Sequence, residues 1–303
     1  MDYKKGLRVK HPSVPEWGIG ELLEDSSGGK ARVFFVGRGE TVLSIKDLDL
    51  VTVTGIDAEH PILDNLKITG DESLRYRTLP QSIQKFLVEF PGGFYGEKFA
   101  KEERDYKLKA HALMNEILSP EELKGLIDKQ NYQELCRRAL KIVNSTNLIF
   151  PNEKMSLKDG LKLESNQQRF SKVLRRLLFE NSEIRQYFRE FCEFLYEINA
   201  AKWTIASYFL FLRSPAQYVF LKPEPTKNCA DICAYDIRYR PDLNWETYDA
   251  VRDFAHFLKD ELTRAELNPR DMIDVQSFMW CIRPDKSLRG RGKTQSKKTD
   301  GAT

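Results

Sequence analysis

The sequence lacks any apolar run that approaches the roughly 20 residues needed to span a bilayer. It also lacks the apolar stretch of a secretory signal behind its N-terminus. Both absences argue against a membrane or secreted protein, so we expect a cytoplasmic chain with no membrane partner. What remains is a chain of 303 residues with 41% hydrophobic, 31% charged and 11% aromatic residues, a composition typical of globular proteins.

Cysteine is scarce. The chain has five cysteines, an odd number, and their spacing fits neither a disulfide framework nor the four ligands of a structural zinc site. Cys229 and Cys233 are four residues apart and would share one face of a helix, but no second pair accompanies them. We therefore predict free thiols in a reducing compartment, with neither a metal site nor a cofactor.

Recognisable catalytic motifs are also missing. There is no His-Glu-x-x-His and no Gly-x-Ser-x-Gly, and residues 91–93 (Pro-Gly-Gly) lack the Lys-Ser/Thr ending of a phosphate-binding loop. Glu97, Asp105 and Lys107 have the residue types of a metal-dependent nuclease, and a strand over residues 95–107 would favour one. The pattern there is helical, however, and puts Asp105 and Lys107 on opposite faces. The sequence thus favours a protein without catalysis, with a nuclease of a defence or repair system as the alternative.

Short strands dominate the N-terminal sixth of the chain, where apolar and polar residues alternate with a period of two. Glycine-rich turns at residues 26–29 and 37–39 separate them. The expected strands lie near residues 7–9, 18–23, 31–36, 41–45 and 50–53. Five such strands in about fifty residues are too few for a sandwich, but they can close into a small SH3-like barrel.

The same segment carries a resemblance. Residues 11–22 read His-Pro-Ser-Val-Pro-Glu-Trp-Gly-Ile-Gly-Glu-Leu, and residues 31–35 read Ala-Arg-Val-Phe-Phe, followed by Gly39. This region resembles the small Tudor-like barrels of bacteria. Among these are the RNA-polymerase-interacting domain of CarD-type transcription regulators, the C-terminal barrel of UvrD/PcrA-type helicases, and a standalone variant with the same opening.

In those relatives the barrel docks on proteins or works beside nucleic acid, without catalysis. The resemblance therefore implies a docking role for part of this barrel. The residues that we expect to carry it are Trp17, Arg32, Phe34 and Arg38. The alternative is that Trp17 and Phe34 only fill or flank the barrel core.

The rest of the chain has a helical period. We predict helices near residues 79–87, 102–118, 120 onwards, 132–143, 167–178, 183–213, 245–262 and 269–280. Beyond Trp203 the longest of them is apolar all round, which predicts the core helix of the domain. Residues 222–225 (Lys-Pro-Glu-Pro) are predicted to be non-helical. Ser119 and Asn244 are predicted N-caps of the helices that follow them, and Asn268 and Pro269 are predicted to cap and begin the last helix.

These patterns predict an α+β fold: a barrel over residues 1–55, a connector over 56–101, a helical domain over 102–283 and a disordered tail over 284–303. The net charge of +3 is unevenly spread. Residues 281–303 hold seven Lys/Arg and two Asp, a charge of +5, whereas residues 1–60 hold eight Lys/Arg and ten Asp/Glu, a charge of -2. The basic charge therefore belongs to the tail.

Two further features suggest contacts with nucleic acid. Four cations lie opposite the apolar stripe of one predicted helix and would form a track for phosphates: Arg169, Lys172, Arg175 and Arg176. The alternative is an ordinary solvated face beside Glu164 and Glu180.

Lysines and aromatic residues also interleave around residues 220–245, where Lys222 and Lys227 would hold phosphates beside stacked bases. The alternative there is a connector that Tyr218, Phe220 and Trp245 pin to the helical core.

Together these observations predict a cytoplasmic, non-catalytic binding protein that acts near nucleic acid or a nucleic-acid enzyme. The barrel would dock on a protein such as RNA polymerase or helicase-type machinery. The helical domain and the basic tail would contact DNA or RNA, mainly through phosphates. Besides the nuclease, the sequence leaves open a scaffold that binds only proteins.

Overall fold

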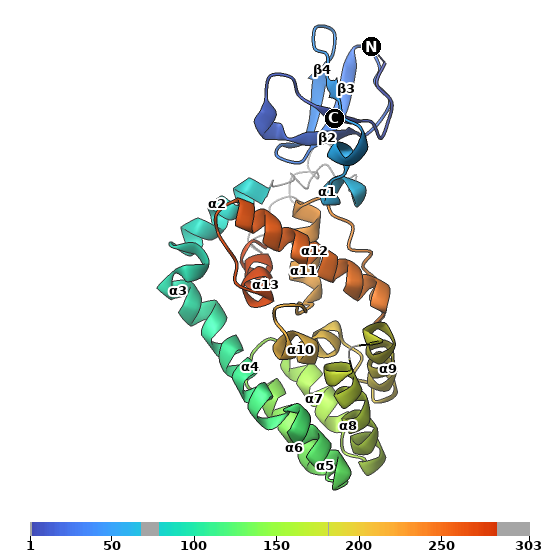
Figure 1. The fold of residues 1–303 in the computed structure, drawn as a ribbon, viewed down its shortest axis with the longest axis vertical. Coiled ribbons are helices and arrows are strands. Elements are labelled where there is room, and N and C mark those ends of the chain that lie inside the picture. Colours follow the sequence, from blue (N-terminus) through green and yellow to red (C-terminus); the bar gives the residue numbers. More distant parts are fainter. Residues whose placement is uncertain (1, 68–78, 181, 284–303) are drawn as a thin grey trace, which may run out of the picture.

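A small sheet and a larger helical body make up the structure, which is a computed structural model that describes residues 2–67, 79–180 and 182–283. The sheet lies at one end of the molecule and the helices fill the rest (Figure 1). The chain is therefore α+β, as the two hydrophobic periods predict. The predicted tail, residues 284–303, lies outside the described residues.

The sheet is antiparallel and has the strand order β4-β3-β2-β1-β5. Its strands are β1 (Arg8–Lys10), β2 (Ile19–Leu22), β3 (Lys30–Phe35), β4 (Gly39–Ser44) and β5 (Val51–Thr52). Successive side chains of a strand point to opposite faces, so Val33 and Phe35 lie on one face of β3. There they form a small separate core with Val9 and Leu22 from the neighbouring strands. At Gly20 a Cβ atom would lie 2.6 Å from the ring of Phe35, its partner on β3, so this close pairing of β2 with β3 requires glycine. The arrangement fits a small barrel-like domain.

The opposite face of β3 joins the sheet to the helical body. Phe34 and Ile19 are buried in the same cluster as Ile62 and Leu63 of the short helix α1 (Pro61–Asp64). The guanidinium of Arg8 crosses the same junction and pairs with Asp64 at 3.1 Å. The start of the predicted connector is therefore packed against the sheet.

Twelve labelled helices follow α1, counting the single turn α3, in the part of the chain that the structure describes. They are α2 (Leu79–Glu89), α3 (Glu97–Phe99), α4 (Asp105–Ile117), α5 (Pro120–Asp128), α6 (Tyr132–Asn144), α7 (Pro151–Gly160), α8 (Glu164–Phe179), α9 (Ile184–Glu197), α10 (Trp203–Arg213), α11 (Pro223–Ile232), α12 (Trp245–Arg264) and α13 (Met272–Cys281). A π-helical turn, Ala100–Arg104, joins α3 to α4. Two predicted N-caps are confirmed: Ser119 accepts from the Glu122 amide at 3.2 Å, and Asn244 accepts from the Thr247 amide at 2.7 Å.

One predicted helix is wrong, because residues 183–213 form two helices. The first, α9, ends at Glu197 and α10 begins at Trp203. Asn199 between them has a φ of 56°, in the left-handed region, and the Ala200 amide donates to the Leu195 carbonyl. This is a common way for a helix to end, and asparagine is one of the few residues that tolerate it.

Two helix starts also differ from expectation. The Lys-Pro-Glu-Pro segment is not extended throughout: α11 begins at Pro223. The amides of a first helical turn have no acceptor within the helix, so Pro223 and Pro225 remove no hydrogen bond there. The last helix begins at Met272 rather than at residue 269, and its cap is Asp271, which accepts from the Ile273 amide at 3.0 Å.

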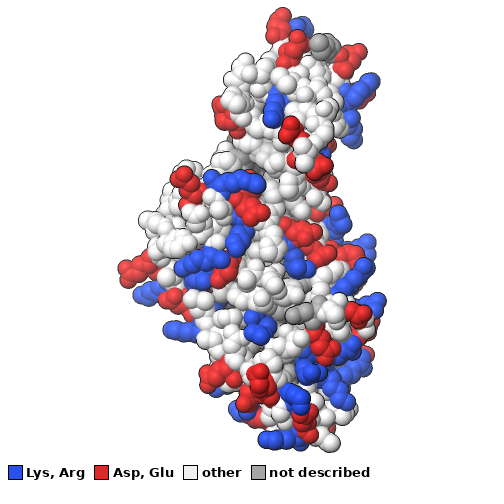
Figure 2. Space-filling model, viewed as in Figure 1, with Lys and Arg blue, Asp and Glu red and all other residues white. Residues whose placement is uncertain are grey.

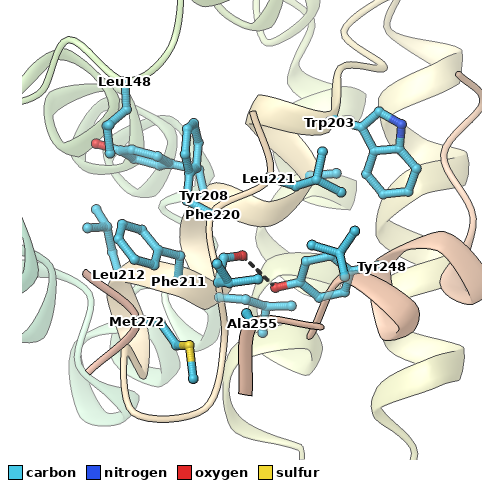
Figure 3. Packing of buried hydrophobic residues seen from close by; sticks show 14 of the residues in the cluster. Leu148, Trp203, Tyr208, Phe211, Leu212, Phe220, Leu221, Tyr248, Ala255 and Met272 are labelled. Atoms are coloured by element: carbon cyan, nitrogen blue, oxygen red, sulfur yellow. Dashed lines mark hydrogen bonds between the residues drawn. The ribbon is translucent and has the colours of Figure 1, made fainter. Parts of the chain in front are cut away.

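Helix α10 is the centre of the helical core, as its all-round apolar sequence predicts. Every residue from Trp203 to Leu212 is buried. Figure 3 shows Tyr208 and Phe211 of α10 beside Phe220 of the extended segment that follows. The hydroxyl of Tyr248 on α12 donates to the carbonyl of Val219 at 3.2 Å, which pins this segment to the core (Figure 3).

Charged side chains are buried where α13 meets the start of α4. Arg104 binds Asp271 through two bonds of 2.8 Å and Asp274 through a third of 2.8 Å. Arg270 donates to the second oxygen of Asp274 at 2.8 Å, and Asp274 is wholly buried. Next to them Lys107, 1% exposed, donates to the Ser277 hydroxyl at 2.7 Å. We call these residues the α13 charge network.

Loss of one carboxylate from this network should be costly. In Asp274→Asn, the buried guanidinium of Arg104 and the more exposed guanidinium of Arg270 lose their shared counter-charge. We expect the free energy of unfolding to fall by about 3 to 5 kcal/mol in urea titrations. Asp128→Asn is the matched control, because Asp128 pairs with Lys124 on the surface and should matter by less than about 0.5 kcal/mol. Similar small losses in both variants would contradict this view.

The break between α9 and α10 gives a second prediction. Asn199 is exposed, so its replacement removes no packing. Asn199→Ala should lower the free energy of unfolding by about 1 kcal/mol, because alanine disfavours the left-handed conformation. Asn199→Gly should leave it unchanged or raise it, because glycine adopts that conformation freely. Equal stabilities of the two variants in denaturant titrations would show that the left-handed residue is not what ends α9.

Candidate functional site

The four predicted docking residues of the barrel do not gather in one place. Arg38 lies over the ring of Trp17, with 5.8 Å from its guanidinium carbon to the ring centroid, and His11 contacts the ring from the edge at 4.8 Å. Arg32 binds Glu40 at 2.5 Å. Phe34 is 5% exposed and packs into the junction with the helical body. Of the four, only Trp17 and Arg38 form a common surface.

The predicted phosphate track on α8 is largely neutralised by carboxylates. Arg169 pairs with Glu197 at 2.5 Å, Arg175 pairs with Glu180 at 3.0 Å, and Arg176 pairs with Glu190. The fourth cation, Lys172, is exposed and has no ion pair among the described residues. The helix places the four side chains together as predicted, but its neighbours cancel much of their charge. Figure 2 likewise shows basic and acidic side chains interspersed over the visible face.

Lys222 and Lys227 lie in different surroundings. Lys227 pairs with Glu224 at 2.6 Å and lies over the Tyr239 ring. Lys222 instead lines a cleft of about 390 Å³ where the start of α11 meets α7 and the end of α13. We call this cleft the α11 cleft. The residues of its lining that matter below are Phe150, Glu153, Lys222, Asn228, Trp280 and Arg283.

The ammonium of Lys222 lies between two aromatic rings. It is 4.4 Å from the centroid of Phe150 and 4.6 Å from that of Trp280. Its only hydrogen bond within the described chain is to the carbonyl of Leu148 at 3.4 Å, and no carboxylate there is at ion-pair distance. Burial lowers the pKa of this lysine, although Glu153 nearby acts in the opposite direction. Lys222 is therefore a half-buried cation without a counter-ion.

The aromatic residues of the cleft are held by their helix ends. Phe150 directly precedes α7, and Glu153 in the first turn of that helix accepts from the Phe150 amide at 3.1 Å and from the Thr204 hydroxyl at 2.8 Å. The Phe150 side chain remains 51% exposed. At the end of α13 the guanidinium of Arg283 lies 3.6 Å from the centroid of Trp280. The cleft thus combines an exposed ring, two cations and two carboxylates, and Glu224, one of the carboxylates, is paired with Lys227.

Sequence reasoning identified Lys222 but missed Phe150, Trp280 and Arg283. Phe150 was missed because helix α7 was not among the predicted helices. Trp280 and Arg283 were assigned only to the end of a helix and to the basic tail. A signal was available, since Phe150 and Lys222 each precede a proline that begins a helix.

A second cleft, of about 550 Å³, lies between α9 and α12. Trp245 lines it, but so do the carboxylates of Glu183, Glu193 and Glu246, against two arginines, Arg185 and Arg189. Arg185 is already paired with Glu246 at 2.6 Å. Carboxylates outnumber cations in this cleft, whereas the α11 cleft has as many cations (Lys222, Arg283) as carboxylates (Glu153, Glu224). The α11 cleft is therefore the stronger candidate for a phosphate-bearing ligand.

The segment that holds the candidate nuclease residues is helical, whereas a strand there would have favoured a nuclease. Residues 97–117 run through α3, the π-helical turn and α4, where Asp105 is exposed and Lys107 is buried. Within the residues that the structure describes, no three His, Cys, Asp or Glu side chains are grouped so as to hold a metal ion. The helices in that part of the chain are also too short or too polar to cross a membrane.

Comparison with known proteins bears only on the sheet. Residues 3–53 match the model of a family described as a protein of unknown function, DUF3553. No curated protein and no solved structure matches the chain. The family match covers the barrel-like sheet, and the α11 cleft lies outside it.

The cysteines give a prediction about reactivity. All five thiols are free and buried, and burial raises the pKa of Cys136 to about 12 and that of Cys192 and Cys281 further. Only a thiolate attacks a disulfide reagent, so at pH 8 we expect less than one thiol per folded chain to react within minutes with Ellman's reagent. All five should react in guanidinium chloride. Rapid reaction of one thiol in the folded protein would reveal an accessible, activated cysteine.

Proposed function

We propose that this protein binds nucleic acid without catalysis, and that it holds the phosphates with the α11 cleft and with the basic C-terminal segment. The observation that carries the proposal is the half-buried ammonium of Lys222, which has no carboxylate at ion-pair distance among the described residues. A phosphate would supply the missing counter-charge. The Thr204 hydroxyl and the Glu153 carboxylate pair in the cleft, but Glu153 is already held by the Phe150 amide at the start of α7. Catalysis is therefore not part of the proposal.

The charge of the sequence that follows Arg283 supports this assignment. Arg283 lines the cleft and is the last described residue. Residues 284–303 continue from that point with six Lys/Arg and two Asp. Cations therefore extend along the chain from the cleft, as a polyanion requires. The arginines of α8 support it less, because a phosphate would have to displace their carboxylate partners.

The barrel supports a second part of the proposal, a protein-docking role beside nucleic-acid machinery such as RNA polymerase or a helicase. Its support is the surface formed by Trp17 and Arg38, since tryptophan and arginine dominate the energetic centres of protein interfaces. Five free cysteines are consistent with action in a reducing compartment, the cytoplasm.

Salt dependence of binding tests which surface holds the phosphates. With a labelled duplex DNA of 20 base pairs, we expect the slope of log affinity against log salt to fall by about one unit in Lys222→Gln. Deletion of residues 284–303 should reduce it by several units. The matched control is the triple variant Arg169→Gln, Arg175→Gln, Arg176→Gln on α8, for which we expect a change below about one unit.

Three results would contradict the proposal in different ways. Absence of binding at low salt would remove nucleic acid as the ligand. An unchanged slope in Lys222→Gln would remove the cleft from the binding surface. A loss of about three units in the triple variant would move the phosphate contacts to α8.

A further inference from the structure

The α11 cleft has the size of a site for a small molecule. Its volume of about 390 Å³ lies near the lower end of the range for ligand pockets. A base inside a duplex is stacked and paired, so it enters such a pocket only after unstacking, which costs a few kcal/mol. An unpaired base does not incur that cost. Size alone therefore favours a single strand over a duplex.

The walls of the cleft suit a flat aromatic group. The Phe150 ring is 51% exposed, and the hydrogen bond from its amide to Glu153 fixes the backbone that carries it. Base stacking on an aromatic side chain contributes about 1 to 3 kcal/mol and tolerates every base. The side chain of Asn228 also lines the cleft and has no hydrogen-bond partner among the described residues, so its amide is free to bond to a base edge.

Two cations are placed for the phosphate that accompanies the base. The Lys222 ammonium lies over the rings of Phe150 and Trp280, and the Arg283 guanidinium lies over Trp280. A nucleotide has a planar base and a phosphate beside it, so one nucleotide satisfies both the exposed ring and the cation without a counter-ion. A free carboxylate or phosphate would leave the ring uncovered.

We infer that the α11 cleft takes one unpaired base of a single strand against Phe150, with the neighbouring phosphate on Lys222 and Arg283. The inference rests on the nucleic-acid binding proposed above and adds that the protein selects single strands. Selection comes from the ring, whereas the charges attract single and double strands alike.

The test uses the full chain and fluorescence anisotropy with a labelled 20-nucleotide single-stranded DNA and its duplex. Phe150→Ala should weaken single-strand binding by roughly 5- to 100-fold and leave duplex binding within about twofold. Phe150→Tyr keeps a ring and should bind like the unaltered protein. Met155→Ala on the same helix is the matched control, because Met155 is 63% exposed and does not line the cleft.

The outcomes separate this inference from the proposed function. If the unaltered protein binds single strand and duplex equally and Phe150→Ala changes neither, the base does not enter the cleft, although nucleic-acid binding stands. If Phe150→Ala weakens the binding of single-stranded and duplex DNA equally, the inference is also overturned, because the ring then does not distinguish unpaired from paired bases. If neither DNA binds at low salt, both the inference and the proposed function fail. The result that supports the inference is weaker single-strand binding by Phe150→Ala than by Phe150→Tyr, with similar duplex binding by both variants.

Discussion

The buried carboxylate of Asp274 is the constraint on which the candidate site depends. It accepts from Arg104, at the start of α4, and from Arg270, just before α13, so it fixes the position of α13 against the first long helix. Trp280 and Arg283 lie at the far end of α13, where Lys85 on α2 also donates to the Arg283 carbonyl at 2.8 Å. Buried charges are costly unless each is paired. The α13 charge network thus fixes the position of Trp280 and Arg283, which line one side of the cleft.

The other wall comes from two helix starts of the same kind. Phe150 and Lys222 each have an extended backbone and each precede a proline at the first helical position. Proline disfavours the helical conformation in the residue before it, so the backbone is extended at both residues and the helix begins only at the proline. The two side chains meet across the cleft, with the Lys222 ammonium over the Phe150 ring. One local rule, used twice, places a ring and a cation together.

Strand β3 shows why a docking surface is hard to read from a barrel sequence. Val33 and Phe35 face the small core, while Phe34 faces outward and is covered by the helical body. In a barrel that stood alone, Phe34 would be an exposed aromatic residue and a natural docking position. In this chain it joins two parts of the same molecule. Trp17, whose ring packs on Phe35 at the end of β3, and Arg38, just after that strand, remain as the surface proposed for a partner.

Local sequence patterns predicted the features that depend on neighbouring residues: the five strands, the caps at Ser119 and Asn244, the all-apolar α10 and the α+β class. They could not place the end of α9, because an asparagine gives only a weak signal for a left-handed residue. Tertiary structure alone decided which charges are free. Carboxylates from other segments neutralise Arg169 and Arg176, while none in the described chain reaches Lys222. The interaction between two charges depends on the distance between them. Distances between segments far apart in the sequence are set by tertiary packing, which no local pattern predicts.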